Sequence, residues 1–394
     1  IALVAVPDVA FQGALKGLKL WWEVVFPALL PFFVGGQILM GLGVVHAMGV
    51  LLEPFMRPLF NLPGIGGFVT AMGLASGYPI GAVLTARLRR QGEITPAEGE
   101  RLMSFANTAD PLFMAGAVAV AMFGNRHVAG ILMSAHYLGA LVTGFVMRFH
   151  KPDAPISPPP APSREPLLAR MQEALLTARQ KDGRPFGQVL GDSVRDSVQT
   201  LLLIGGFIMV FSVIIDLLVA AKVVAAMGWV LAPLLRPLGL EGQLAPSLMA
   251  GLFEITLGTQ LSSEAAAPLV DRLVVASAII GWAGLSVHAQ VAALTEGTGM
   301  NIAPYIMARF IHAVVAGALV PLLMGGHIPT AAWLSVPDPG SLPLGSGFLG
   351  WGTIAAQSTA RLAATVVVAG AVGLALTGLQ ALLRTRVLAA GRRL

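Results

Sequence analysis

The sequence predicts an all-helical, polytopic membrane protein made of two similar halves in inverted orientation. Each half is expected to contain one re-entrant helical hairpin and one broken transmembrane helix. The first observation is composition: of 394 residues, 56% are hydrophobic and only 11% are charged, whereas soluble domains carry about 25% charged residues. The second is a series of apolar segments long enough to cross a bilayer. The third is a set of short patterns that occurs twice in the same order.

Composition also excludes several kinds of site. The chain has no cysteine, so it has no disulfide, no thiolate metal site and no cysteine nucleophile. Its net charge of +5 favours contact with anionic lipid head groups, and no basic run with interleaved aromatic residues indicates a nucleic-acid partner. We find no G-x-S-x-G, H-E-x-x-H, Walker or dinucleotide-binding motif, so the sequence predicts neither an enzyme nor a resident cofactor or metal.

Seven apolar segments are predicted to span the membrane, because each is long enough to cross about 30 Å of hydrocarbon. They cover residues 24–47, 102–123, 127–147, 200–221, 268–294, 302–325 and 360–383. Residues 1–25 begin with the apolar "IALVAV", which we expect to be the end of a truncated first span, followed by a connector. Two further apolar segments, 64–86 and 243–262, are rich in glycine and interrupted by polar residues.

Residues 149–199 differ from the rest in composition, and we expect them to form a cytoplasmic linker. The stretch "KPDAPISPPPAPSREP" is rich in proline and is predicted to be extended. The stretch "EPLLARMQEALLTARQKDGR" places apolar residues at helical spacing among mixed charges, which predicts a surface helix. After the second half, residues 326–358 are expected to form an extracytoplasmic loop and residues 359–394 a final span with a basic tail.

An internal repeat divides the chain into halves at residues 26–148 and 200–325. "PFMRPL" at 54–59 returns as "PLLRPL" at 233–238. Each copy is followed by a glycine-rich apolar segment, then by a span interrupted by polar residues, and then by an uninterrupted span. The shared order indicates duplication.

The distribution of positive charge decides between two topologies. If each glycine-rich segment crosses the membrane fully, the arginines of the C-terminal "RTRVLAAGRRL" lie on the side opposite the central linker. If each is a re-entrant hairpin, the second half is inverted, and most of the 25 lysines and arginines lie on the linker side. Because cytoplasmic loops carry an excess of Lys and Arg, we favour the inverted repeat with two re-entrant hairpins.

The polar interruptions predict where the helices break. In "SGYP" we expect Pro79 to be the first residue of a half-helix and Ser76 or Gly77 to cap it. In "NTADP" we expect Asp110 to be the N-cap and Pro111 to open the next half-helix. Non-helical backbone at membrane depth persists only where protein or a watery cavity surrounds it, and transporters use such breaks to bind substrates and ions. The alternative is a set of plain kinks that serve helix packing.

The candidate substrate-binding residues lie at or beside these interruptions. They are Ser76, Gly77, Tyr78, Pro79, Asn107, Thr108, Glu254, Thr256, Ser286, His288, Gln290 and Arg309. Asp110 and Glu254 are carboxyl groups in apolar segments, so they are candidates for coupling to Na⁺ or a proton. The alternative is that each caps a helix.

Three of these assignments depend on local geometry. Ser286, His288 and Gln290 alternate in "LSVHAQV", and they share one cavity only if this stretch is unwound. On an intact helix, Ser286 and Gln290 lie on one face and His288 points elsewhere. Arg309 is expected to pair with Glu254 or Asp110 or to hold a carboxylate substrate, and the alternative is that it extends to the membrane interface. His136 and His312 lie in the closing spans of the two halves, and for them packing and hydrogen bonding is favoured over a functional role.

Several long strings resemble a known family. They are "GLKLWWEVVFPALLPFFVGGQILMGLGVVHAMGVLLEPFMRPLF", "GLASGYPIGA", "ERLMSFANTADPLFMAGAVAVAMFG" and "HYLGALVTGF". They resemble the YlbJ (SpoVV) family of sporulation integral membrane proteins over most of residues 17–148, and more loosely over 200–325. Members carry two nucleoside-recognition Gate domains, one in each half. Gate domains are similar to the core of concentrative nucleoside transporters, which has two opposed re-entrant hairpins and two broken helices.

The resemblance implies a multi-pass protein of the outer forespore membrane that moves dipicolinic acid during spore formation. Dipicolinate is a small aromatic dicarboxylate that chelates calcium, so Ca²⁺ is a candidate companion of the substrate. The alternatives are a cation-coupled nucleoside transporter and a non-transporting scaffold that recruits partners through the linker helix. A homo-oligomer assembled through spans outside the hairpin core is a further expectation.

Overall fold

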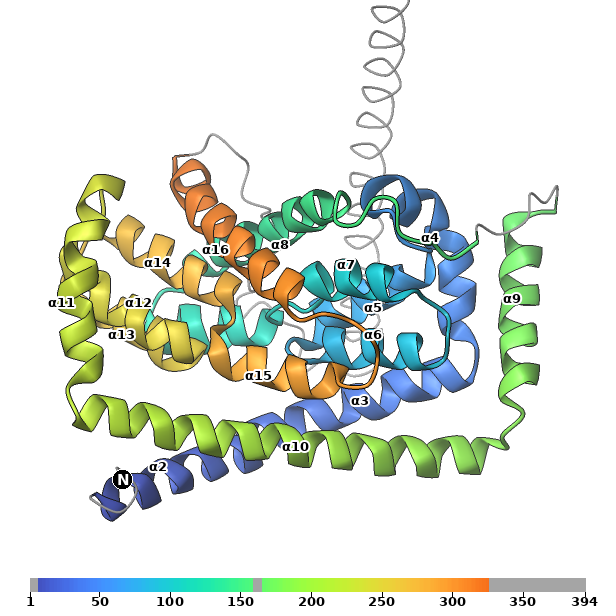
Figure 1. Cartoon of the computed structure of the whole chain (residues 1–394), viewed down its shortest axis with the longest axis horizontal. Coiled ribbons are helices and arrows are strands. Elements are labelled where there is room, and N and C mark those ends of the chain that lie inside the picture. The colour runs from blue at the N-terminus through green and yellow to red at the C-terminus, as the bar shows by residue number, and fades with distance from the viewer. Residues whose placement is uncertain (1–5, 159–164, 326–394) are drawn as a thin grey trace, which may run out of the picture.

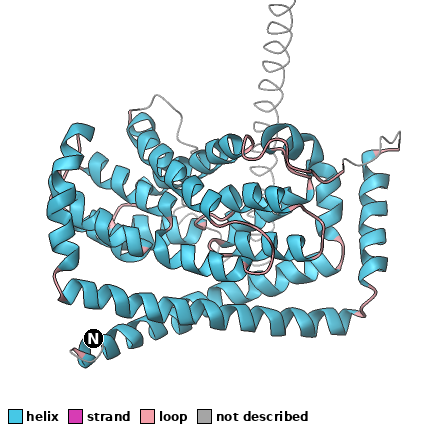
Figure 2. Ribbon diagram, viewed as in Figure 1, coloured by secondary structure: helices cyan, strands magenta, loops and turns pink. Residues whose placement is uncertain are grey.

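The structure is a computed structural model that describes residues 6–158 and 165–325. Every regular element in those residues is a helix, which confirms the predicted all-helical fold (Figures 1 and 2). The first half contains α2 (Pro7–Leu20), the π-helical η1 (Trp21–Val25), α3 (Phe26–Gly41), α4 (Val44–Phe60), α5 (Ile65–Ser76), α6 (Ile80–Arg90), α7 (Pro96–Ala106), the π-helical η2 (Phe113–Met122) and α8 (Val128–Met147). After α9 (Leu167–Asp182), the second half contains α10 (Phe186–Ala220), α11 (Val223–Leu235), the 3₁₀ turns η3 (Arg236–Leu238) and η4 (Gly242–Leu244), α12 (Ala245–Phe253), α13 (Ile255–Glu264), α14 (Leu269–Trp282), α15 (Gly284–Thr295) and α16 (Ala303–Met324).

Long apolar helices occur where most of the spans are predicted. Within the described residues, four helical segments are long and apolar enough to cross a membrane: α8, α10, the joined α14 and α15, and α16. A fifth is obtained if α3 and α4 count as one bent span. The predicted span 200–221 is part of the longer α10, and the predicted span 360–383, with the loop and tail around it, lies outside the described residues.

The predicted span 24–47 is not one straight helix. Its two parts, α3 and α4, meet at an angle of 84°. The turn uses Gly43, whose φ of 81° is in the left-handed region that favours glycine. A Cβ on Gly43 would lie 2.4 Å from the backbone oxygen of Leu175 in α9, so the turn also needs a residue without a side chain.

The second half turns at the equivalent place. The chain changes direction between α10 and α11 at Lys222, whose φ is 57°. In Figure 1, α4 and α9 lie at one end of the long axis and α11 lies at the other, with α10 running between the two ends. The two P-x-x-R-P-L copies, at the ends of α4 and α11, therefore lie toward opposite ends of the molecule.

The interrupted spans are broken helices. The predicted span 102–123 stops as an α-helix at Ala106 and resumes as a helix at Pro111, most of it in the π form of η2. The sequence predicts this break but not the π form. In the second half, α14 and α15 meet at Ala283, a non-glycine residue with a φ of 74°.

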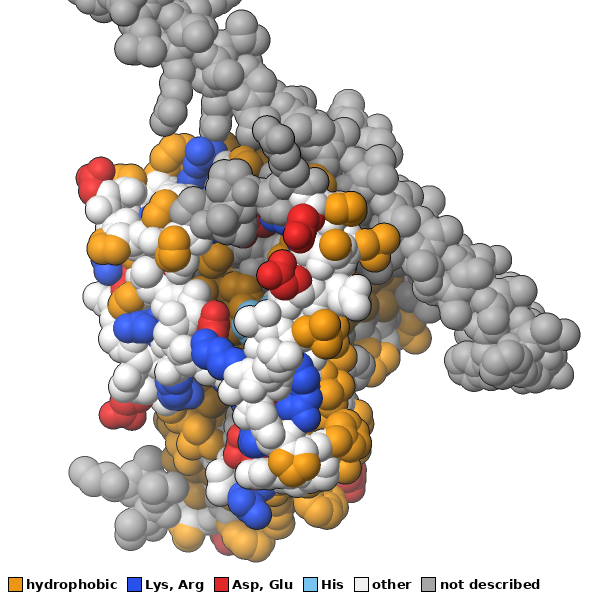
Figure 3. All heavy atoms as spheres, turned by 90° about the vertical axis from the view of Figure 1, so that its right-hand side faces the viewer, with side chains coloured by type: hydrophobic (Ala, Val, Ile, Leu, Met, Phe, Trp, Pro, Cys, Tyr) orange, Lys and Arg blue, Asp and Glu red, His pale blue; other side chains and the backbone are white. Residues whose placement is uncertain are grey.

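The linker contains the predicted surface helix, α9, which packs against α4. The helix α10 begins at Phe186, so the helical part of the second half starts inside the segment 149–199 that the sequence assigns to the linker. Figure 3 views the molecule from the α9 side and shows Lys and Arg side chains interspersed with Asp and Glu over that face. Near the N-terminus, α2 packs along α10, and Lys16 Nζ lies 3.5 Å from Asp216 Oδ1.

Candidate functional site

The first hairpin turns at Gly77 to Pro79. Helix α5 runs through Ser76, Gly77 has a φ of 78°, the Tyr78–Pro79 peptide bond is cis, and α6 begins at Ile80. No side chain caps α6. The expectation that Ser76 or Gly77 caps a half-helix starting at Pro79 is therefore wrong, because Ser76 still belongs to the preceding helix and Pro79 is itself the N-cap.

Glycines let this hairpin touch the break in the first broken helix. A Cβ on Gly73 or Gly81 would lie 1.8 or 2.3 Å from the Ala106 backbone oxygen. A Cβ on Gly77 would lie 2.5 Å from Asp110 Oδ2. These distances are too short for any side chain, so the hairpin and the break fit together only with glycine at these positions.

Asp110 caps the second part of the broken helix, as predicted. Its Oδ1 accepts a hydrogen bond of 2.8 Å from the backbone N–H of Phe113. Glu254 has the equivalent role at the tip of the second hairpin, where its carboxylate accepts from the N–H groups of Thr256 at 2.9 Å and Leu257 at 2.8 Å. Both carboxylates therefore satisfy helix N-termini, whose partial positive charge stabilises an anion.

The second hairpin touches the second break in the same way. A Cβ on Gly284, the first residue of α15, would lie 3.1 Å from the Cα of Glu254 and 2.9 Å from the Phe253 oxygen. Each half thus places its hairpin tip directly on its own broken helix. Thr256, in the first turn of α13, lies beside this contact and is partly exposed.

Two hydrogen bonds join the first hairpin tip and the first break to helices of the second half. The Tyr78 hydroxyl donates to the Ile280 backbone oxygen at 2.8 Å, which links the first hairpin tip to α14. The Asn107 side-chain amide donates to the Tyr305 hydroxyl at 2.9 Å, which links the first break to α16. Tyr78 and Tyr305 also pack with Ala283 in one hydrophobic cluster, so the first tip, both breaks and α16 meet in one place.

Arg309 lies fully buried at this meeting point. It donates to the backbone oxygen of Asn107 at 2.9 Å and to that of Ser104, and its guanidinium lies 5.6 Å from the centre of the Tyr305 ring. Because these oxygens terminate α7, Arg309 satisfies the negative end of that half-helix. Neither the expected pairing with Glu254 or Asp110 nor an extension to the interface is observed, and no carboxylate of the described residues lies within ion-pair distance of Arg309.

The segment with Ser286, His288 and Gln290 is an intact helix, α15, so the unwound alternative is wrong. The break lies earlier, at Ala283. All three side chains are buried. His288 Nε2 bonds to the Trp282 oxygen at 2.8 Å, and its ring lies 5.5 Å from the Tyr305 ring.

Several polar atoms around the first break are buried and have no hydrogen-bond partner among the described residues. They are Ser76 Oγ, Asn107 Oδ1, Thr108 Oγ1 and Arg309 Nε. Burying such a group without a partner costs about 1–3 kcal/mol. Asn107, Thr108 and Arg309 are 0% exposed, so a ligand reaches them only if the surrounding helices move.

The sequence-predicted residues form two sets. One set contains the first tip, the first break and Arg309. His288 belongs to this set because its ring lies beside the Tyr305 ring. The other contains Glu254 and Thr256 at the second tip, which contacts the second break. Among the described residues, no hydrogen bond or ion pair joins the Glu254 carboxylate to Arg309, Asn107 or Asp110.

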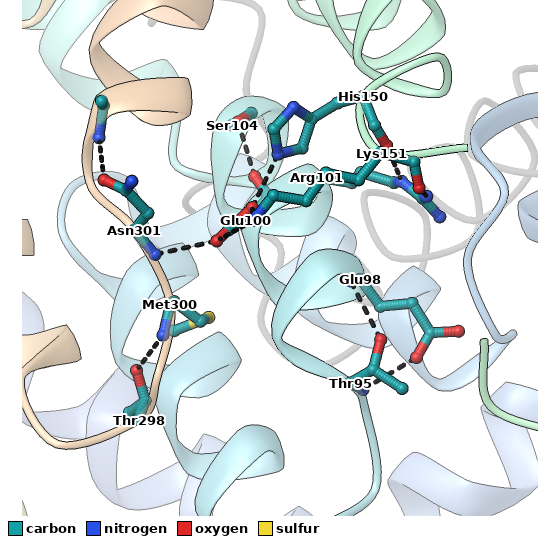
Figure 4. Close-up of polar contacts among 11 residues, drawn as sticks. Thr95, Glu98, Glu100, Arg101, Ser104, His150, Lys151, Thr298, Met300 and Asn301 are labelled. Atoms are coloured by element: carbon teal, nitrogen blue, oxygen red, sulfur yellow. Dashed lines mark hydrogen bonds and ion pairs between the residues drawn. The ribbon is translucent and has the colours of Figure 1, made fainter. Parts of the chain in front are cut away.

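A polar cluster closes the linker-facing end of α7 (Figure 4). The buried Glu100 carboxylate contacts Lys151 Nζ at 2.8 Å and His150 Nε2 at 2.6 Å, both from the start of the linker. It also accepts from the Asn301 N–H at 2.9 Å, in the connection between α15 and α16. An open hollow of about 820 Å³ lies at that connection, lined by residues from Ala292 to Ile302, and it does not reach the breaks.

Arg101 reinforces the same cluster. Its guanidinium is buried and donates to the backbone oxygens of Asn61 at 3.0 Å, His150 at 2.9 Å and Lys151 at 2.6 Å. The start of the linker is therefore attached to α7 by the side chains of Glu100 and Arg101. Arg309 bonds to the C-terminal end of α7, so this half-helix is held both at its middle and at that end.

The linker helix is attached nearby through Glu93. The Glu93 carboxylate contacts Lys181 Nζ of α9 at 3.2 Å and His46 Nε2 of α4 at 3.8 Å. The nearby His46, followed by the hydrogen bond from Lys181, lowers the pKa of Glu93 from 4.5 to about 2, although partial burial acts in the opposite direction. A carboxylate held ionised in this way ties α9 and α4 to the connection between α6 and α7.

Sequence reasoning missed Tyr305, Trp282, Glu100 and Arg101. Tyr305 had a usable signal, because the chain has only three tyrosines. All three bond to this central region: Tyr137 bonds to the oxygens of Leu74 and Ala109, at 3.4 and 3.3 Å. Arg101 and Glu100 gave no such signal, since charges near the end of a predicted span are expected at the interface.

Known proteins resemble this chain in sequence and in structure. The Gate family model, described as nucleoside recognition, matches residues 22–141 and 201–321. The sporulation integral membrane protein YlbJ of Bacillus subtilis (strain 168) is 45% identical over 326 residues, which cover 82% of this chain and 79% of that protein. A solved structure of CNTnw in an inward-facing substrate-bound state is 15% identical with a TM-score of 0.38, and the match covers 81% of this chain and 84% of that one.

The two Gate matches divide the chain as the repeat does, with one match in each half. The identity to YlbJ extends over both halves and the segment between them. The protein therefore belongs to the Gate (nucleoside recognition) family and, within it, to the family of the integral membrane protein YlbJ.

Proposed function

We propose that the protein is a secondary transporter that moves dipicolinic acid, or a related small aromatic carboxylate, across the outer forespore membrane during spore formation. The role in spore formation is inferred from the printed name of the relative, a sporulation integral membrane protein. The observation that carries the substrate class is Arg309, a fully buried cation for which the described residues supply no carboxylate. A buried charge without a counter-ion is costly even when it is hydrogen-bonded, and a substrate carboxylate beside Arg309 offsets that cost.

The proposed binding site consists of the two hairpin tips and the two breaks. Its residues are the twelve predicted ones: Ser76, Gly77, Tyr78, Pro79, Asn107, Thr108, Glu254, Thr256, Ser286, His288, Gln290 and Arg309. Arg309 Nε, Ser76 Oγ and Thr108 Oγ1 have no protein partner among the described residues, so they are available to the oxygens of a carboxylate. Tyr78 offers an aromatic surface for the pyridine ring.

The carboxylates of the first break and the second hairpin tip are the basis for proposing cation coupling. Asp110 and Glu254 each cap a helix N-terminus, but their remaining lone pairs are free to bind a cation. A dianion near two carboxylates is repelled unless a cation or proton accompanies it. We therefore propose that Na⁺ or a proton couples at Asp110 and Glu254, and that Ca²⁺ chelated by dipicolinate is an alternative companion.

The proposed topology is an inverted repeat in which both hairpins are re-entrant. The gathering of Arg57, Arg101 and Lys151 with the linker supports it, since Arg57 bonds to the Ser157 oxygen at 3.1 Å. Assembly as a homo-oligomer through spans outside the hairpins is part of the same proposal.

Two other functions remain as proposals. A nucleoside carrier is favoured by the description of the family, and by the buried neutral polar groups of Asn107 and Gln290. A scaffold that recruits partners through the linker helix is less favoured. The reason is that α9 is held on α4 and by the Glu93–Lys181 contact, which leaves only its outer face accessible.

The test is uptake by proteoliposomes that contain the purified full chain. Labelled dipicolinate and labelled uridine are compared with and without a Na⁺ or proton gradient. Saturable dipicolinate uptake that is lost in Asp110→Asn and Glu254→Gln, but kept in Glu241→Gln on the connection before α12, supports the proposal. Uridine uptake alone favours the nucleoside carrier, and movement of neither by folded protein favours the scaffold.

A further inference from the structure

Two buried histidines lie side by side with their rings tilted by 30°, and the substrate-site residues do not include them. His136 lies in α8 and His312 in α16, their ring centres are 4.5 Å apart, and both are at most 1% exposed. Ionisable groups in the interior of a membrane protein are costly and generally functional. The hydrogen bonds of the pair show which of the two is connected to the break.

His136 is bonded to the first break through an acceptor nitrogen. The backbone N–H of Ala109 donates to His136 Nε2 at 3.0 Å. A ring nitrogen that accepts a hydrogen bond carries no proton, so His136 is neutral with its proton on Nδ1. If Nε2 takes a proton it becomes a donor, and the bond to Ala109 must break.

His312 has the opposite arrangement. Its Nε2 bonds to the His136 backbone oxygen at 2.7 Å, and because a carbonyl only accepts, this nitrogen carries the proton. Protonation of His312 at Nδ1 leaves that bond intact. Protonation therefore changes a bond to the break only at His136. The partner in that bond, Ala109, directly precedes the helix cap Asp110.

The charges facing His136 make protonation depend on an anion. From α16 they are Arg309, whose positive charge acts on His136, and His312. On its own helix the neighbour is Tyr137, and α14 and η2 present the apolar Leu273, Ala276 and Met114 to this part of α8. No described carboxylate contacts the pair, so a proton on His136 is opposed by Arg309 until a negative charge is bound there.

We propose that His136 is the proton-binding site that couples proton movement to the binding of a carboxylate substrate at the first break. This inference rests on the proposed function and deepens it: it assigns the coupled proton to His136 and leaves Na⁺ as the ion for Asp110 and Glu254. A carboxylate beside Arg309 lowers the electrostatic cost of a proton on Nε2, and the proton releases the Ala109 N–H and lets the break move. By thermodynamic reciprocity, a proton on His136 strengthens carboxylate binding by the same factor. The proton enters from the water on one side with the substrate and leaves to the water on the other side.

The test measures protons and dipicolinate together in proteoliposomes, with an enclosed pH indicator and labelled dipicolinate. Wild-type protein is expected to move at least one proton per dipicolinate, and an imposed pH gradient is expected to drive accumulation. In His136→Gln, whose amide oxygen can still accept from Ala109, the proton-to-dipicolinate ratio is expected to fall to zero. The ratio is expected to stay at the wild-type value in His312→Gln and in the exposed control His127→Gln.

The outcomes separate this inference from the proposed function. If wild-type protein shows no exchange of labelled for unlabelled dipicolinate, the proposed function fails and the inference fails with it. If exchange occurs but no proton accompanies dipicolinate in the wild type, the inference alone is overturned, and this measurement needs no variant to fold. It is also overturned if the proton-to-dipicolinate ratio falls to zero in His312→Gln but stays at the wild-type value in His136→Gln or His136→Asn.

Discussion

The Tyr78 hydroxyl donates a hydrogen bond of 2.8 Å to the backbone oxygen of Ile280. The donor is at the tip of the first hairpin, and the acceptor is near the end of α14, three residues before the second break at Ala283. The bond therefore ties the tip of one half to the broken helix of the other. A movement of either half that separates these elements must break it.

Removing this hydroxyl is expected to destabilise the contact between the halves. In Tyr78→Phe the Ile280 oxygen loses its side-chain donor, and loss of a hydrogen bond to a buried acceptor costs about 1–3 kcal/mol. Thermal unfolding in detergent, followed by intrinsic fluorescence, measures the effect. Tyr137→Phe is the matched control, because its hydroxyl makes only longer bonds of 3.3 and 3.4 Å. Equal stability losses in the two variants would contradict the special role of Tyr78.

A methyl group at the first tip is expected to be poorly tolerated. Gly77 has a φ of 78°, and a Cβ there would lie 2.5 Å from Asp110 Oδ2. In Gly77→Ala the backbone strain alone costs roughly 1–3 kcal/mol, and the cap at Asp110 must shift. Gly130→Ala in α8 is the control, since nothing lies within 4 Å of the added methyl. The melting temperature should fall for Gly77→Ala and stay level or rise for Gly130→Ala, because alanine favours helices.

Replacing Arg309 is expected to release the end of α7. Lysine carries the charge but presents a single ammonium group in place of the planar fork that reaches two carbonyls. Glutamine removes the charge and leaves at least one carbonyl without a donor, at a cost of about 1–3 kcal/mol. Both Arg309→Lys and Arg309→Gln should lower the melting temperature, whereas the exposed Arg236→Gln should not. Wild-type stability in Arg309→Gln would show that α7 ends without help from α16.

The attachment of the linker helix is expected to weaken in acid. The pKa of Glu93 is lowered from 4.5 to about 2, so its ionised form is favoured in the folded state. Its contribution to stability is therefore fully present above the ordinary carboxyl pKa and is lost as the pH falls from about 4.5 toward 2. Limited proteolysis of residues 165–184 with pepsin, over that pH range, measures release of α9.

The control for this prediction is Glu93→Gln. Glutamine cannot ionise, so the variant should be cleaved more readily at the upper end of the range and should show a weaker dependence on pH than the wild type. If both proteins show the same change in cleavage with pH, another group holds α9 in place.

Local sequence chemistry was sufficient to predict much of the fold. The apolar segments predict the long helices α8, α14 with α15, and α16, and helical spacing predicts α9. Asp110 as an N-cap follows from residue type and position alone, because capping is decided within one turn. The form of the first tip was not predictable in the same way, since Ser76 suits both a cap and a helix end, and the packing of the hairpin against Ala106 decides between them.

The amino-acid sequence alone is enough to predict a helical membrane protein with two similar halves and with breaks near Gly77, Asn107 and Glu254. These properties depend on hydrophobicity, glycine, proline and capping, which act over a few neighbouring residues. Three further features follow only from the packing of the helices: the fourth break lies at Ala283 and not within residues 286–290, Arg309 bonds to the end of α7 and not to Asp110 or Glu254, and His136 accepts from Ala109. Those partners are distant in the chain or on separate helices, and a buried polar group bonds to whichever partner the packing of whole helices brings within about 3 Å.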